Sequence, residues 1–115
     1  MTIQTSLRAE PSRLTTDTRD QLRVTLSATN SGTETVNPEL HRAELLVNGR
    51  RSRAFHSAVG NGRREEKWYA LPPGDTVEMT WSTLGERLLA GPGNYTLVLS
   101  FDGREAEPVS VSVEN

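Results

Sequence analysis

Two runs of strictly alternating apolar and polar residues, within residues 70–103, constrain the fold of this 115-residue chain more than any other feature. The apolar positions are Val77, Met79 and Trp81 in the first run, and Tyr95, Leu97, Leu99 and Phe101 in the second. A period of two is typical of β-strands with one buried face and one solvated face. The connection between the runs is too long for a tight hairpin, so we expect the chain to cross there between two packed sheets.

The N-terminal half predicts further short strands separated by turns. Residues 2–9 form the first expected strand, which Pro11 limits to a sheet edge because proline cannot donate to a β-ladder. Residues 20–30 alternate regularly and predict a half-buried strand. Asn48-Gly49 is a strong hairpin signal and favours a type I′ turn into a strand over residues 50–55.

Two connections differ in character. Residues 56–67 contain Gly60, Asn61 and Gly62 and no apolar period, so we expect a long exposed loop. Residues 83–90 favour two helical turns, because Leu84 and Leu88 are four positions apart and Ser82 or Thr83 can cap the N-terminus.

The last strands raise a question of register. Val109, Val111 and Val113 share one face of a strand, and a two-residue turn at Asp102-Gly103 would put that face in water. We therefore expect either a three-residue loop with a bulge, or a bulge near Glu107-Pro108.

The strand count is seven or eight, with turns at the roughly 8–12-residue spacing of immunoglobulin-like domains and almost no helix. The sequence therefore predicts one all-β domain over residues 1–115, an immunoglobulin-like sandwich of two antiparallel sheets. Tyr95 follows Gly91-Pro92-Gly93 at a strand entry, the position of a tyrosine corner whose hydroxyl bonds to the preceding loop. The expected core comprises Leu22, Val24, Leu26, Leu45, Val77, Met79, Trp81, Tyr95, Leu97, Leu99, Phe101, Val109 and Val111.

Composition excludes several classes of protein. The chain has no cysteine, so disulfides, thiolate metal sites and a cysteine nucleophile are impossible. Thirteen basic and 15 acidic residues give a net charge of −2, too small to indicate a nucleic-acid or membrane partner. No apolar run approaches the roughly 18 residues that span a bilayer, and no secretory signal is present. We expect a cytoplasmic protein, or a mature fragment of an exported one.

No residue pattern indicates a catalytic centre, a metal site or a cofactor. The two histidines, His41 and His56, lack ligand or nucleophile–base spacing, and we expect both at the surface. Trp81 continues an apolar face and is expected in the core, whereas Trp68 follows the charged loop and is expected to be partly exposed. The sequence therefore predicts a protein that is not an enzyme.

Charge is distributed unevenly along the chain. Residues 42–67 hold seven basic and three acidic residues, a net of +4, and the remainder holds six basic and twelve acidic residues, a net of −6. Such a basic lobe steers acidic partners, although solvated charges that keep an edge strand from aggregating explain the same pattern. Nucleic acid is disfavoured because no aromatic residues are interleaved with the basic ones. The residues assigned to partner binding are Arg50, Arg51, Arg53, Arg63, Arg64 and Lys67, with Trp68 as an aromatic anchor at the rim.

Three segments resemble bacterial intracellular proteinase inhibitor domains, which inhibit subtilisin-like serine proteinases. The segments are Leu71-Pro72-Pro73-Gly74-Asp75, Met79-Thr80-Trp81 and Pro92-Gly93-Asn94-Tyr95-Thr96-Leu97, which follow the succession of an L-x-P-G turn, a strand ending in Trp, and P-G-x-Y-T. The resemblance covers roughly residues 22–113 as an order of elements, and it assigns no inhibitory residue. Similar turns also occur in bacterial immunoglobulin-like modules that space or dock other domains.

The sequence therefore favours a non-enzymatic protein-binding module, and the resemblance implies a serine proteinase as its partner. The alternative is an accessory or spacer immunoglobulin-like domain of a larger bacterial assembly. A carbohydrate-binding module is less favoured, because the two Trp, two Tyr and two Phe residues are mostly assigned to the core.

Overall fold

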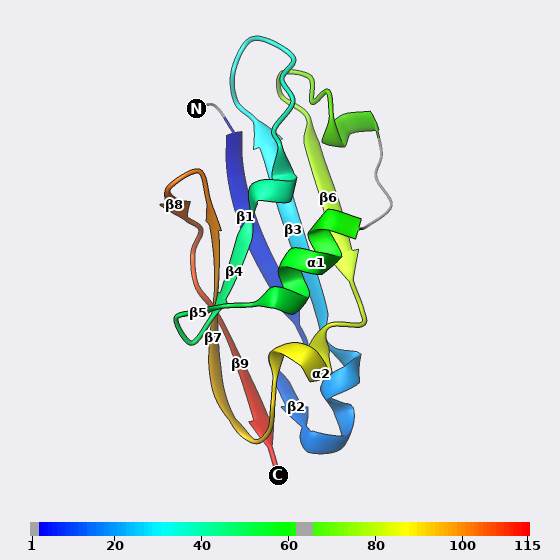
Figure 1. Ribbon diagram of the computed structural model, residues 1–115, viewed down its shortest axis with the longest axis vertical. Helices are drawn as coiled ribbons and strands as arrows, with labels where there is room; N and C mark the ends of the chain where they lie inside the picture. Colours follow the sequence, from blue (N-terminus) through cyan, green and yellow to red (C-terminus); the bar gives the residue numbers. More distant parts are fainter. Residues whose placement is uncertain (1–2, 62–65) are drawn as a thin grey trace.

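The computed structural model describes residues 3–61 and 66–115, and its strands confirm the expected all-β class (Figure 1). The described residues contain nine strands rather than seven to eight, and three of the nine are only two or three residues long. The strands are β1 (Ile3–Glu10), β2 (Arg13–Thr15), β3 (Arg23–Asn30), β4 (Glu44–Val47), β5 (Arg50–Arg51), β6 (Thr76–Trp81), β7 (Gly93–Phe101), β8 (Arg104–Glu105) and β9 (Val109–Glu114). The helices are α1 (Arg53–Asn61), α2 (Gly85–Leu88) and the 3₁₀ helices Thr16–Gln21, Leu40–Arg42 and Glu66–Trp68.

The strands form two sheets. The first has the order β1-β3-β6 and is antiparallel throughout. The second has the order β2-β9-β7-β4-β5, with β8 also paired to β7, and it is antiparallel except where β2 runs parallel to β9. The connection from β6 to β7 passes from the first sheet to the second, as the two alternating runs predicted.

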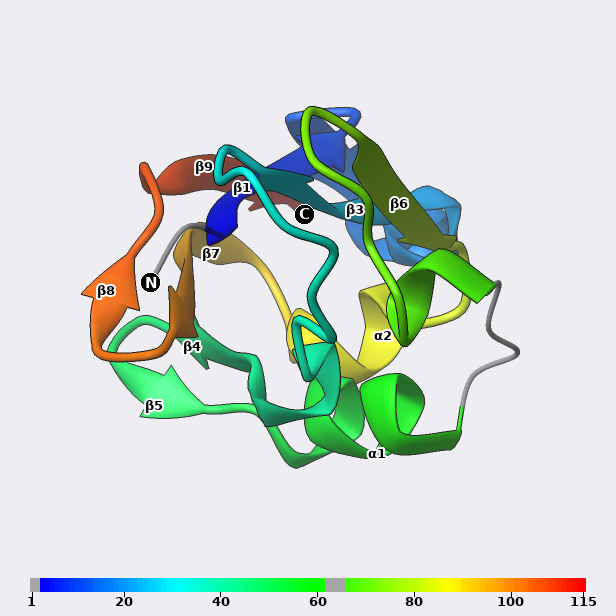
Figure 2. The ribbon, with the colours of Figure 1, turned by 90° about the horizontal axis from the view of Figure 1, so that it is seen from above.

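The N-terminal segment contributes to both sheets. β1 is the edge strand of the first sheet, as expected, and pairs with β3 along its whole length. After Pro11 the chain continues as β2, which pairs with β9 in the second sheet. Figure 2 shows β1 and β9 close together where the two sheets meet. One continuous stretch of chain therefore joins the sheets on this side.

Residues 50–61 do not form the expected hairpin strand and exposed loop. The turn at Asn48-Gly49 does form, with positive φ angles of 50° and 85°, as a type I′ turn requires. β5 then pairs with β4 for only two residues, after which α1 begins. Ser52 ends the strand and caps the helix, because its Oγ accepts a hydrogen bond from the Phe55 backbone N–H at 3.1 Å.

Helix α1 closes the side on which the two sheets diverge (Figure 2). Phe55 and Val59, one helical turn apart, are both fully buried. The Phe55 ring meets Trp81 of β6 edge-on, with ring centroids 5.2 Å apart. An aromatic pair in this geometry adds about 1 kcal/mol beyond its area burial. The helix thus connects the edge of the second sheet to the edge of the first.

The burial of the two tryptophans is the reverse of the expectation: Trp68 is buried and Trp81 is only partly buried. Trp68 is 2% exposed, because the 3₁₀ helix that ends at Trp68 turns this side chain into the core. Trp81 is only partly buried, since it lies at the end of an edge strand with α1 on one side. Of the expected core, Met79, Tyr95 and Val109 are also only partly buried, and the other expected residues are buried.

The C-terminal register contains the expected bulge near Glu107-Pro108. Asp102-Gly103 is a two-residue turn, so that Phe101 lies opposite Arg104. Continuing that register would place Leu97 opposite Pro108, yet Leu97 lies opposite Val109. One extra residue between β8 and β9 therefore returns the valines of β9 to the core, as their alternation required.

The turn that follows β3 is held by the buried side chain of Asn30, which is 0% exposed. The side-chain amide donates to the carbonyl oxygens of Glu34 at 2.7 Å and Leu71 at 2.9 Å, and its oxygen accepts from the Gly32 N–H at 2.9 Å. The Asn30 backbone also bonds to Gly74 and Asp75. A single residue therefore links the end of β3 to the segment before β6.

Replacement of Asn30 by Asp tests this link. The carboxylate cannot donate to the two carbonyl oxygens and would be a buried charge without a cation, so we expect a loss of about 3 kcal/mol in the free energy of unfolding. The control is Asn37→Asp, because exposed Asn37 only accepts a hydrogen bond, from the Glu39 N–H. Urea unfolding measures both variants, and equal effects would contradict the role given to Asn30.

Candidate functional site

Three of the arginines assigned to partner binding gather at one edge of the second sheet. Arg50 and Arg51 form β5, the edge strand beside β4, and Arg53 is the first residue of α1. All three side chains are exposed. We call Arg50, Arg51 and Arg53 the basic edge.

The local structure fixes the direction of the chain at the basic edge. The type I′ turn at Asn48-Gly49 is tied to β7, because the Asn48 side-chain oxygen accepts from the Thr96 N–H at 2.8 Å. The Ser52 N–H, between Arg51 and Arg53 in the chain, donates to the Leu45 carbonyl oxygen at 2.8 Å. The guanidinium groups therefore extend from a backbone that is held on both sides.

A hollow of about 340 Å³ lies beside the basic edge. Its lining consists of Glu44, Arg51, Ser52, Arg53 and His56. Arg51 Nη2 lies 2.8 Å from Glu44 Oε1, whereas Arg50 and Arg53 make no ion pair with any residue that the structure describes. Within the described part of the chain, two of the three guanidinium groups thus have no carboxylate within ion-pair distance.

The other residues assigned to partner binding do not join this surface. Lys67 lies in the 3₁₀ helix Glu66–Trp68, on the far side of α1 from β5 in Figures 1 and 2, and its Nζ is 3.6 Å from Asp75 Oδ2. Trp68 is buried and cannot act as an exposed anchor, which corrects the expectation from sequence. Arg63 and Arg64 lie outside the described residues.

Other exposed side chains complete this description. The exposed large hydrophobic residue is Tyr69, 54% accessible, directly after Trp68. His41 and His56 are both exposed, as expected.

In residues 3–61 and 66–115, no three His, Asp or Glu side chains are grouped as metal ligands would be. None of the helices in these ranges is both long and apolar enough to cross a membrane.

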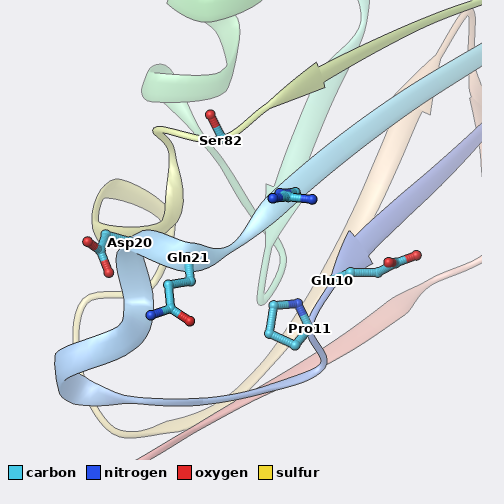
Figure 3. Close-up of a pocket in the computed structure, with 6 residues that line it drawn as sticks. Glu10, Pro11, Asp20, Gln21 and Ser82 are labelled. Carbon is cyan, nitrogen blue, oxygen red and sulfur yellow. The ribbon is translucent and has the colours of Figure 1, made fainter.

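A second hollow lies on the outer face of the first sheet, and no pattern in the sequence indicates it. It has a volume of about 650 Å³ and is drawn in Figure 3. Its lining consists of Glu10, Pro11, Asp20, Gln21, Arg23 and Ser82. These residues come from the end of β1 and the residue after it, the end of the 3₁₀ helix Thr16–Gln21, the start of β3 and the residue after β6, so the folded arrangement brings them together. We call this the polar hollow.

Comparisons with known proteins bear on the fold. No protein-family model matches the sequence, and no curated protein matches it. Two solved structures that it resembles are crystal structures of a β-glucosidase from Listeria innocua, one in complex with glucose and one with isofagomine. The TM-scores are 0.53 and 0.52, at sequence identities of 12% and 13%. Each match covers 98% of this chain and 16% of the β-glucosidase chain, and at these identities the likeness concerns the fold alone.

Proposed function

We propose that this chain is an immunoglobulin-like domain that binds another protein through its basic edge and catalyses no reaction. The strand order supports the fold assignment. The first sheet corresponds to strands A, B and E of such domains, and β9, β7, β4 and β5 correspond to G, F, C and C′.

Tyr95 gives independent support for the immunoglobulin-like assignment. It lies near the start of β7, the strand that corresponds to F. Its hydroxyl donates to the Gly91 carbonyl oxygen at 2.7 Å and accepts from the Gly91 N–H at 3.0 Å. A hydroxyl bonded to backbone a few residues upstream is the tyrosine corner of these sandwiches.

The observation that carries the binding proposal is the accumulation of exposed arginines at one sheet edge. Among the described residues, Arg50, Arg51 and Arg53 have a single close carboxylate, that of Glu44, which pairs with Arg51. Arginine is enriched in protein interfaces, and a cationic edge on an otherwise acidic chain attracts an acidic partner and orients it during encounter. The proposed partner therefore presents a carboxylate-rich surface.

The position of Arg53 at the N-terminus of α1 is unfavourable for the stability of this helix. It is the first residue of α1, and no acidic residue occupies the first turn of this helix. The N-terminus of a helix carries partial positive charge, so a cation there is destabilising. A residue that opposes local stability is typical of a functional surface.

The resemblance to intracellular proteinase inhibitors suggests which partner to test first. These domains inhibit subtilisin-like serine proteinases, and we propose such a proteinase as the partner class. The resemblance assigns no inhibitory residue, so the basic edge is proposed only to control the approach of the partner.

The second candidate function is that of a spacer domain in a larger assembly, and the shape of the domain favours it. The chain measures 48 × 24 × 21 Å, and β1 begins at the opposite end of the long axis from the C-terminus (Figure 1). A domain with this arrangement holds its chain neighbours apart. The β-glucosidases that share its fold contain the matching region as 16% of their own length.

Arg53→Glu tests the argument about the helix N-terminus. The carboxylate interacts favourably with the partial positive charge, so we expect the free energy of unfolding to rise by about 0.5 kcal/mol. Arg53→Gln removes only the cation and should give a smaller rise. Thermal and urea unfolding at low salt measure both, and a destabilised Arg53→Glu variant would contradict the argument.

The partner proposal is tested with subtilisin and a small chromogenic peptide substrate. We expect dose-dependent loss of proteinase activity while the domain stays uncleaved. The triple variant Arg50→Gln, Arg51→Gln, Arg53→Gln should associate about tenfold more slowly at low salt and depend less on salt.

The matched control for that experiment is Arg13→Gln, Arg87→Gln, Arg104→Gln, which removes three exposed arginines elsewhere and should keep the wild-type association rate. An absence of inhibition would remove the proteinase as a partner. Equal association rates for the two triple variants would remove the role of the basic edge.

The spacer proposal is tested by fusing a fluorescent protein to each end of the chain. The start of β1 and the C-terminus lie at opposite poles, so the two fluorescent proteins should be about one domain length apart or more. We expect an energy-transfer efficiency no higher than that separation gives, and an unchanged melting temperature of the central domain. High transfer efficiency, or destabilisation of the domain by the flanking proteins, would contradict a spacer role.

A further inference from the structure

The outer face of the first sheet consists of rows of polar residues, and three of these rows are closed by their own hydrogen bonds. The hydroxyl groups of Thr25 and Thr80 are 2.8 Å apart, and those of Thr29 and Thr76 are 2.7 Å apart. The Ser27 hydroxyl donates to the Glu78 carboxylate at 2.6 Å. In these three rows, the side chains of β3 and β6 are therefore bonded to one another.

The row at the start of β3 differs. Arg23 lies opposite Glu10 of β1, and Ser82 follows the end of β6. The side chains of Asp20, Gln21, Arg23 and Ser82 make no hydrogen bond and no ion pair with any other residue in the described part of the chain. Unlike the other three rows, Arg23 and Ser82 are not joined by a hydrogen bond, and both residues line the polar hollow.

The polar hollow has charges of both signs. In Figure 3, Asp20 and Glu10 lie at opposite ends of the hollow, with Gln21 and Pro11 between them along one side and Ser82 on the other. Arg23 lines this hollow and also a smaller adjoining one of about 190 Å³. Arg23 is exposed, and two carboxylates, those of Glu10 and Asp20, line the same hollow; that of Glu10 has Arg8 at 3.9 Å.

We propose that the polar hollow binds an acidic side chain of a partner polypeptide on Arg23, with basic side chains of the same segment directed to Asp20 and Glu10. A guanidinium group binds a carboxylate through two parallel hydrogen bonds, which gives the contact its direction. The Gln21 amide and the Ser82 hydroxyl can each donate to or accept from the backbone of such a segment.

The same charges determine what the hollow rejects. A polyanion such as nucleic acid would bring further negative charge against Asp20 and Glu10, and a purely basic segment would meet Arg23. The preferred segment therefore has an acidic residue flanked by basic ones. Pro11 is the one apolar residue in the lining, so we expect a dissociation constant on the order of 100 μM.

The experiment uses two capped synthetic peptides with the ¹⁵N-labelled domain in an NMR titration. One peptide has a glutamate with a lysine two residues away on each side, and the other has the signs reversed. We expect saturable shifts at residues 20–23 and 82 with the first peptide only. Arg23→Gln should weaken binding about tenfold, and Asp20→Asn with Glu10→Gln should abolish the preference for flanking lysines.

Arg104→Gln is the matched control, because Arg104 is also exposed but lies in β8, in the other sheet. It should leave the affinity unchanged. An absence of saturable shifts, equal affinity for both peptides, or equal effects of Arg23→Gln and Arg104→Gln would overturn the proposal. Because the basic edge lies on the second sheet, its triple variant should bind the peptide normally, and this separates the two proposals.

Discussion

The packing of α1 into the open side between the two sheets is the interaction on which the rest of the structure depends. The sheets meet where β1 continues into β2, and they separate toward β5 on one sheet and β6 on the other (Figure 2). Without α1, that side would expose the apolar groups that face the core. Phe55 and Val59 fill the space, and Phe55 reaches Trp81 at the far edge. Burial of two such side chains contributes about 4 kcal/mol.

The position of the basic edge follows from this closure. β5 has to end after two residues so that the chain can turn into α1, and Ser52 makes the turn by ending one element and capping the next. Arg51 and Arg53 therefore lie on either side of a turn and line the same hollow. In the expected continuous hairpin strand, these two residues would have shared one face of an extended segment.

Alternation along the chain predicted much of the fold, because a period of two reports directly which face of a strand is buried. It also predicted the bulge between β8 and β9, where the valine face and the turn length disagreed. Alternation does not show how completely the neighbouring elements cover the inward face of a strand. For this reason Trp81, at the end of an edge strand, is less buried than Trp68, which belongs to no alternating run.

Helix α1 was missed although the sequence contains a signal for it. Ala54, Phe55, Ala58 and Val59 repeat at the spacing of one helical turn, with Ser52 in the capping position. Asn48-Gly49 favours a hairpin before this segment, and Gly60, Asn61 and Gly62 favour a loop after it. The hairpin signal is confirmed, but Gly60 and Asn61 belong to α1 rather than to a loop, and Gly62 lies outside the described residues. The strand after the hairpin turn is short because the open side of the core is filled by a helix.

The candidate surfaces differ in how far sequence could reveal them. The basic edge is contiguous in sequence and was visible as a run of arginines. The polar hollow combines residues from the ends of strands and from the 3₁₀ helix Thr16–Gln21, and no local spacing connects Glu10 or Asp20 with Ser82. What distinguishes it is the contrast with three other rows of the first sheet, in which the side chains of β3 and β6 bond to one another. Such a contrast exists only once the register of β1, β3 and β6 is known.

Binding and spacing make compatible demands on this domain. The long axis carries the chain from β1 at one end to the C-terminus at the other, so neighbours in a longer chain would occupy the poles (Figure 1). The basic edge lies at mid-height on an edge of the second sheet (Figure 1), so neighbours at the poles leave it open, whereas the polar hollow lies toward the pole that carries the C-terminus. Their charge patterns also differ, one cationic and one of both signs. The proposed binding at the basic edge is therefore compatible with the proposed spacer role, whereas a neighbour after the C-terminus would lie beside the polar hollow.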